Sequence, residues 1–93
     1  MVHLMDNQEQ KVKINMDFHA IEYASRLGED QDKLQARYQS LADDCTIYLL
    51  KDDLTVEQSQ YAKTIKESCL LKIHFMTISK EEKAKHANMW SRR

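Results

Sequence analysis

The sequence predicts an all-α fold of about five short helices in one small domain. The 93 residues include one Gly and no Pro, whereas tight turns and all-β folds usually need several of each. Apolar residues recur at spacings of three and four along much of the chain, as they do in amphipathic helices. The length allows one domain with a small core of its own. We therefore expect a frayed segment over residues 1–10 and a single helical domain over residues 11–93.

The first predicted helix covers residues 11–27. One apolar stripe, with spacings of four and three, contains Ile14, Phe18 and Ile21. A neighbouring apolar stripe contains Met16, Ala20, Tyr23 and Leu27. Together they form a face wider than a lone surface helix needs. Gly28 follows at once and suits the left-handed conformation that often ends a helix.

Two further helices are predicted before residue 54. Asp30 is a candidate N-cap for a helix over residues 31–42. The apolar residues that recur there, at spacings of four, three and four, are Leu34, Tyr38, Leu41 and Cys45. The pair at residues 43–44 could cap a short helix over residues 45–51, which the acidic pair at residues 52–53 would end.

The segment after residue 54 contains a capping box and then a change of period. Thr55 and Gln58 have capping-box spacing and open a predicted helix over residues 56–67. Over residues 69–76, Leu71, Ile73 and Phe75 alternate with polar residues, which is typical of a short β-strand. Such a strand would need a partner for its backbone, for instance the same segment of a second subunit. The other interpretation is an apolar extension of the helix.

The carboxyl-terminal end is predicted to form a basic helix. Ser79 and Glu82 have capping-box spacing, which opens a last helix over residues 80–90. Residues 1–54 carry six basic and eleven acidic residues, whereas residues 55–93 carry eight basic and four acidic ones. The candidates for contact with DNA phosphates are Lys80, Lys83, Lys85, Arg92 and Arg93. Because the net charge of the chain is −1, a uniformly basic nucleic-acid coat is excluded.

Residue patterns that would indicate an enzyme or a metal site are missing from the sequence. It contains no HExxH motif, no Gly-framed nucleophile and no phosphate-binding loop. Cys69 and His74 could form a thiol–imidazole pair, but a buried thiol beside an exposed ring is the commoner arrangement. The spacing of Cys45, Cys69, His74 and His86 matches no zinc module. We expect no catalysis, no cofactor and no metal in this chain.

The sequence also predicts where the protein resides. No apolar run approaches the roughly 20 residues of a membrane span, and the first residues lack the pattern of a signal peptide. The two cysteines stand apart, without CxxC spacing, which suits a reducing compartment. We expect a cytoplasmic protein with no membrane contact.

Several short motifs resemble the FlhD family, whose members are subunits of the bacterial flagellar master transcription activator. Residues 14–18 (INMDF) and 24–27 (ASRL) are similar to the family's I-N-L-S-Y and A-Q-R-L stretches. Further similar segments, in the same order, are residues 31–33 (QDK), 36–38 (ARY), 54–58 (LTVEQ), 62–64 (AKT) and 69–75 (CLLKIHF). The resemblance covers roughly residues 12–76, and its weight lies in the order and spacing of the motifs.

The resemblance implies an intertwined helical homodimer that joins an FlhC-like subunit, which in the family carries the zinc site and much of the DNA contact. The chain would then be a dimeric scaffold of a transcription activator and would meet DNA mainly through the complex. The candidate dimer-interface residues are Phe18, Ile21, Leu71, Ile73 and Phe75. A short, divergent chain of this kind suits the FlhD-like activators of some conjugative elements.

The chain departs from the family pattern in two places. The family's Cys within L-V-C-H-F falls on Leu71 here, so no role of that Cys carries over. The chain also continues for fewer residues after Phe75, which puts the family's carboxyl-terminal DNA-associated region in doubt. A different function class fits the same helices without DNA: a small helical interaction protein, such as a secretion chaperone or an inhibitor of a host factor.

Overall fold

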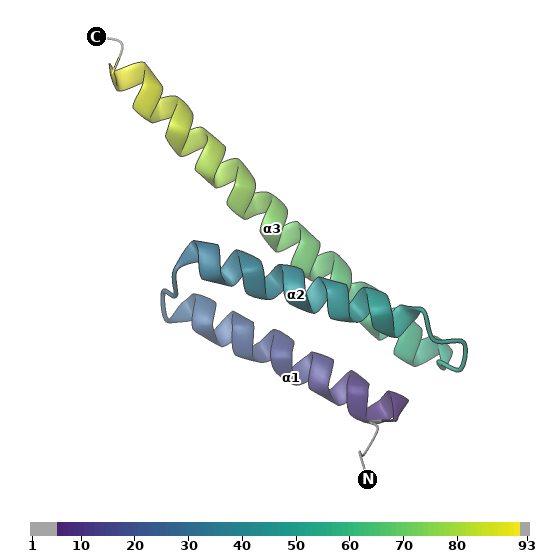
Figure 1. Cartoon of the computed structure of the whole chain (residues 1–93). Coiled ribbons are helices and arrows are strands. Elements are labelled where there is room, and N and C mark those ends of the chain that lie inside the picture. Colours follow the sequence, from purple (N-terminus) through teal and green to yellow (C-terminus); the bar gives the residue numbers. More distant parts are fainter. Residues whose placement is uncertain (1–5, 92–93) are drawn as a thin grey trace.

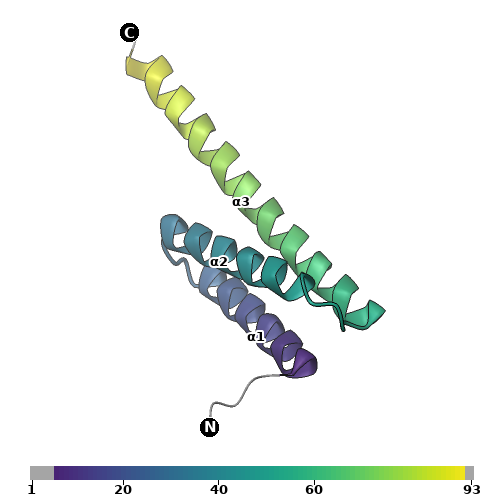
Figure 2. The same ribbon diagram turned by 45° about the vertical axis from the view of Figure 1, so that its right-hand side comes forward.

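The structure is a computed structural model that describes the backbone of residues 6–91 and the side chains of residues 6–82. Within that range it contains three α-helices: α1 (Asn7–Arg26), α2 (Gln31–Leu49) and α3 (Val56–Ser91). α1 and α2 form an antiparallel hairpin, and α3 runs along α2 before it projects past the hairpin (Figures 1 and 2). The molecule is elongated, with extents of 64 × 23 × 21 Å. The predicted all-α class is confirmed over these residues, but with three helices in place of five.

α1 begins earlier than the sequence predicted and ends where it predicted. The Asp6 carboxylate accepts a hydrogen bond of 2.8 Å from the Glu9 backbone N–H, so the helix is capped within the segment expected to be frayed. Residues 1–5 lie outside the described residues. At the other end, Gly28 has φ of +83°. The Gly28 and Glu29 N–H groups donate to the carbonyls of Ser25 and Ala24, which is the Schellman arrangement.

α2 is one continuous helix, so the prediction of a boundary at residues 43–44 is wrong. Asp30 does occupy the N-cap position, although its side chain makes no capping hydrogen bond. Asp43 and Asp44 are exposed, and Gln39 donates a hydrogen bond of 3.1 Å to the Asp43 carboxylate. The apolar stripe on the other side of the helix continues past them to Tyr48. Packing of that stripe outweighs the low helix propensity of the two aspartates.

α3 is also continuous, so the predicted strand over residues 69–76 is wrong and the helical alternative is confirmed. The core residues Ala62, Ile65 and Cys69 are spaced by three and four, and Ile73 and Met76 continue that spacing against the core. The Thr77 hydroxyl donates to the Ile73 carbonyl four residues earlier, as Thr side chains do within a helix. A helix satisfies its backbone internally, whereas a lone strand would not.

Of the two predicted capping boxes, the first is confirmed and the second is not. The Thr55 hydroxyl accepts from the Gln58 N–H, and the Gln58 side chain accepts from the Thr55 N–H, both at 3.1 Å. Ser79 lies in the interior of α3 instead of capping a new helix. The stretch from residue 56 to residue 91 contains no Gly or Pro that would end the helix.

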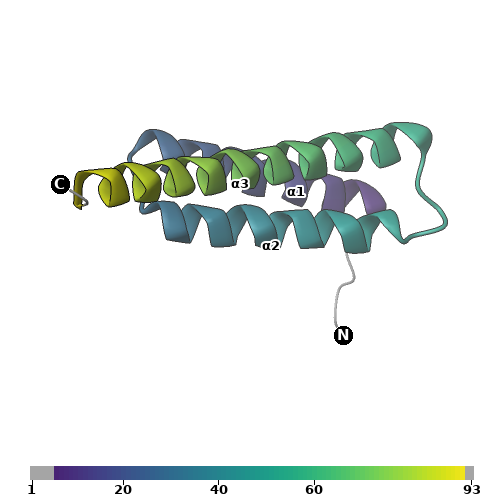
Figure 3. The same cartoon turned by 90° about the horizontal axis from the view of Figure 1, so that it is seen from above.

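The core lies where all three helices meet, with α2 in contact with both others (Figure 3). Its buried residues are Ile14, Ile21, Leu34, Tyr38, Leu41, Ala42, Cys45, Tyr48, Ala62, Ile65 and Cys69. Tyr48 also donates from its hydroxyl to the Asn7 carbonyl at 2.9 Å, which fixes the start of α1 against the end of α2. The core is therefore small and is centred on one helix.

Mutations can distinguish the capping box that forms from the one that does not. Thr55→Ala removes a formed cap, and we expect it to lower the free energy of unfolding by about 1 kcal/mol. Ser79→Ala lies inside a helix, where Ala is the best helix former, so we expect a change within about 0.5 kcal/mol. Urea unfolding followed by circular dichroism measures both. Equal destabilisation by the two variants would show that a helix begins near residue 79 after all.

Candidate interaction surfaces

α1 carries apolar side chains on the face that points away from the core. Ile14 and Ile21 are buried against the core. At 100° per residue, the opposite side of the helix carries a second apolar row. Its members and their exposed fractions are Val12 47%, Met16 64%, Tyr23 63% and Leu27 70%. We name this row the α1 outer stripe. The sequence predicts that Met16, Tyr23 and Leu27 neighbour the core stripe in one wide face, but the structure separates the two stripes onto opposite faces of α1.

α3 carries a similar row on its outward face. Ile73 and Met76 face the core, and three apolar side chains at spacings of four and three lie on the other side of the helix. Their exposed fractions are Leu71 55%, Phe75 59% and Ile78 36%. We name this row the α3 outer stripe. It lies on the half of α3 that extends along and past the amino-terminal end of α2 (Figures 1 and 2).

The structure divides the candidate dimer-interface residues into two groups. Ile21 is buried, and Phe18 and Ile73 pack against the core of their own chain. Leu71 and Phe75 are exposed and belong to the α3 outer stripe. In this structure the second group is the one that is largely exposed to another molecule.

The basic candidates are described in part. The Lys80 ammonium pairs with the Asp32 carboxylate and lies 3.5 Å from the Gln35 side-chain oxygen, so α3 is held against the start of α2 there. Lys83 and Lys85 belong to α3, but their side chains lie outside the described residues, as do Arg92 and Arg93. Lys80, the one basic candidate whose side chain is described, is therefore paired within the chain.

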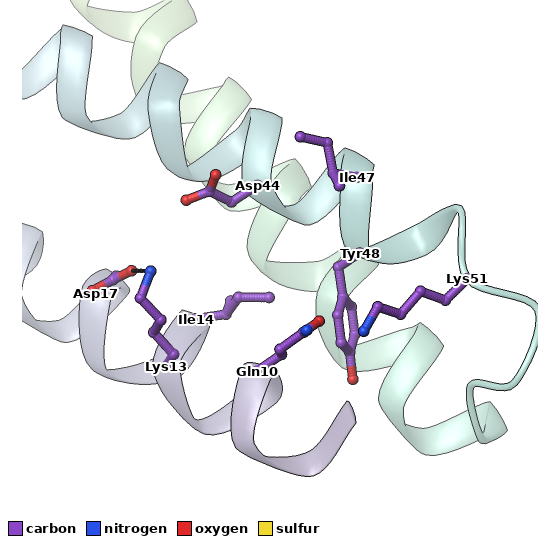
Figure 4. Close-up of a pocket in the computed structure, with 8 residues that line it drawn as sticks. All are labelled: Gln10, Lys13, Ile14, Asp17, Asp44, Ile47, Tyr48 and Lys51. Carbon is purple, nitrogen blue, oxygen red and sulfur yellow. Dashed lines mark ion pairs between the residues drawn. The ribbon is translucent and has the colours of Figure 1, made fainter. Parts of the chain in front are cut away.

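A shallow groove lies between α1 and the end of α2, with a volume of about 330 Å³ (Figure 4). Ile14 lies at its floor, and Lys13 at its rim pairs with Asp17 at 3.7 Å. Lys51 donates a hydrogen bond of 3.0 Å to the Asn7 side chain. Lys13, Asp17 and Lys51 are thus engaged with partners in the same chain, and the exposed Asp44 is the remaining charged residue of the lining.

The two thiols of the core are unsuited to chemistry at neutral pH. Cys45 on α2 and Cys69 on α3 are fully buried and unbridged. Burial raises the pKa of the Cys45 thiol to about 11, with a further contribution from Asp44. Burial and the nearby Cys45 raise the pKa of the Cys69 thiol to about 12. His74 is exposed, so the possible Cys69–His74 pair is not assembled in this structure.

Neither metal ligands nor a membrane span is found in the described residues. No three His, Cys, Asp or Glu side chains among them are grouped closely enough to hold a metal ion. No helix in the described range is long and apolar enough to cross a membrane.

The sequence pattern does not mark the α1 outer stripe as a binding surface. It predicts that Met16, Tyr23 and Leu27 share one wide apolar face with the core residues, and it assigns no role to Val12 or, on α3, to Ile78. The available signal is the second apolar stripe of α1, because α2 and α3 both pack near the first stripe and leave the second exposed.

The burial of the thiols leads to a test by chemical labelling. A thiol whose pKa rises from about 9 to about 11, as for Cys45, has about 100-fold less thiolate at neutral pH. We expect a water-soluble disulfide reagent to react at least 100-fold more slowly with the native protein than with the protein in urea. The unfolded chain should reach half of its maximal rate near pH 9, whereas the native protein should do so only near pH 11 or above. Equal rates at neutral pH would reveal an accessible thiolate and contradict the packing described above.

Comparison of the chain with models of protein families, with curated proteins and with solved structures found no match in any of the three.

Proposed function

We propose that this chain is a helical binding subunit that holds another protein against the α3 outer stripe. The observation that carries the proposal is the exposure of Leu71, Phe75 and Ile78 in one row on α3. Positions i, i+4 and i+7 are the anchors by which an amphipathic helix enters an apolar groove of a partner. The expected partner surface is therefore an apolar groove, or a second helix with a matching row.

Burial of this row by a partner would favour binding. Full burial of a Leu, Ile or Phe side chain contributes about 1.5–3 kcal/mol. A few such residues usually dominate the energy of an interface, and aromatic side chains are frequent among its anchors. Phe75 combines the largest side chain of the three with 59% exposure. We therefore propose Phe75 as the central anchor.

The more specific form of the proposal follows from the resemblance to the FlhD family. In that form the partner is an FlhC-like protein, and the chain is a scaffold subunit of a transcription activator. DNA would be contacted mainly by the partner, since Lys80 is engaged with Asp32. Basic residues beyond it would add contacts with phosphates, which position a protein on DNA without reading its sequence.

Co-expression with an FlhC-like protein encoded beside this chain tests the proposal. We expect the two proteins to purify together and the complex to retard a promoter fragment in a gel, whereas the chain alone should bind DNA weakly or not at all. Phe75→Glu should abolish co-purification, because a carboxylate would be buried without a partner. Met16→Glu is the matched control, since Met16 is equally exposed but belongs to the α1 outer stripe.

Different outcomes separate the function classes. Loss of the complex with Met16→Glu but not with Phe75→Glu would contradict the proposed surface. No complex with any FlhC-like protein would contradict the activator role and would favour the secretion chaperone or host-factor inhibitor. Tight, sequence-selective DNA binding by the chain alone would contradict a scaffold role.

A further inference from the structure

We infer that the α1 outer stripe is a two-fold interface on which a second copy of this chain packs its own α1 in the antiparallel direction. This inference goes beyond the proposed function, because it assigns the other apolar surface and a different partner. It also differs from an intertwined dimer. Each chain keeps its own three-helix core, and the two cores pair as separate bodies.

The spacing of the stripe carries the inference. The spacings along the row are four, seven and four residues, between Val12, Met16, Tyr23 and Leu27. This spacing is symmetric about a midpoint between His19 and Ala20. In an antiparallel pair centred there, Val12 meets the partner's Leu27 and Met16 meets the partner's Tyr23. An interface between identical chains about a two-fold axis requires such self-complementarity.

The centre of the stripe permits close approach of the two helices. Ala20 is exposed and lies on the flank of the row at its midpoint. A small residue at the crossing point lets two helices pack at the short end of the usual 8–10 Å range. The larger side chains then lie on both sides of the crossing, where the space between two helices widens.

The exposure of the α1 outer stripe leaves apolar surface for a partner. Met16, Tyr23 and Leu27 are each more than 60% exposed. One helix pair lies at the lower end of interface sizes, so we expect micromolar affinity for the second copy.

The position of α1 leaves this face open to a second copy. α1 lies at the edge of the molecule, on the side of α2 away from the projecting half of α3 (Figures 1 and 2). A second copy on the α1 outer stripe would therefore leave the α3 outer stripe uncovered. The two surfaces can be occupied at the same time.

Solution mass measurements on the full chain test the interface. Sedimentation equilibrium over micromolar concentrations should show a mass rising from 11.0 kDa towards twice that value. Met16→Glu and Tyr23→Glu should each raise the dimer dissociation constant at least about tenfold. Phe75→Glu is the matched control and should leave it unchanged. Circular dichroism should show the same helix content in all variants, because these side chains are largely exposed in the monomer.

Disulfide trapping tests the direction and register independently of stability. A mixture of the Met16→Cys and Tyr23→Cys variants should form the mixed disulfide under mild oxidation, identified by its mass, while each variant alone should cross-link poorly. Ala20→Cys, beside the two-fold axis, should cross-link with itself. The wild type is the blank, because Cys45 and Cys69 are buried.

Three results would overturn the inference. They are a monomer at all concentrations, a dimer dissociated by Phe75→Glu but not by Met16→Glu, and efficient self-linking of Met16→Cys without the mixed disulfide. The first two leave the proposed partner complex untouched, because that complex is measured by co-purification. The third would indicate a parallel pair.

Discussion

The structure depends on α2, the helix that makes the most extensive contacts with the other two. Its stripe from Leu34 to Tyr48 supplies six of the eleven buried residues of the core. Tyr38 is 1% exposed and Cys45 is fully buried, so α2 has no apolar surface to spare on that stripe. α1 and α3 each have α2 as their main neighbour and touch one another less. Among residues 6–91, no further element covers the outward faces of the three helices.

Local features of the fold could be predicted from sequence because they depend on a few adjacent residues. The capping box at Thr55 and the positive φ at Gly28 each involve only a few neighbouring residues. The continuity of α2 and α3 could not be predicted in this way. Asp43 and Ser79 are both compatible with a helix end and a helix interior, and the choice is made by the packing of apolar residues on the opposite side of the helix.

The candidate surfaces show the same limit more sharply. Residues 71–75 alternate between apolar and polar, but Ile73 also continues the helical row of Cys69, and Leu71 and Phe75 are four residues apart. These residues therefore fit both the two-residue period of a strand and the period of a helix. The contact of Ile73 with the core decides in favour of the helix. On α1, both Ile21 and Tyr23 are apolar. The sequence does not indicate which of the two α2 will cover. The outer stripes can therefore be identified only from the three-dimensional structure.

The placement of the two outer stripes bears on how a binding subunit of this kind would work. A two-fold pair formed through α1 would present two copies of the α3 outer stripe, related by the same axis and directed away from the pairing surface. A partner held at each stripe would then be duplicated with the same symmetry. Two DNA-binding partners fixed in this way would match a two-fold-symmetric site on DNA. Because one contact brings the second within reach, the pair would bind far more tightly than either partner alone. Such a subunit would not need a strongly basic surface of its own. It would act by positioning the two partners, and the partners would make the direct contacts with DNA.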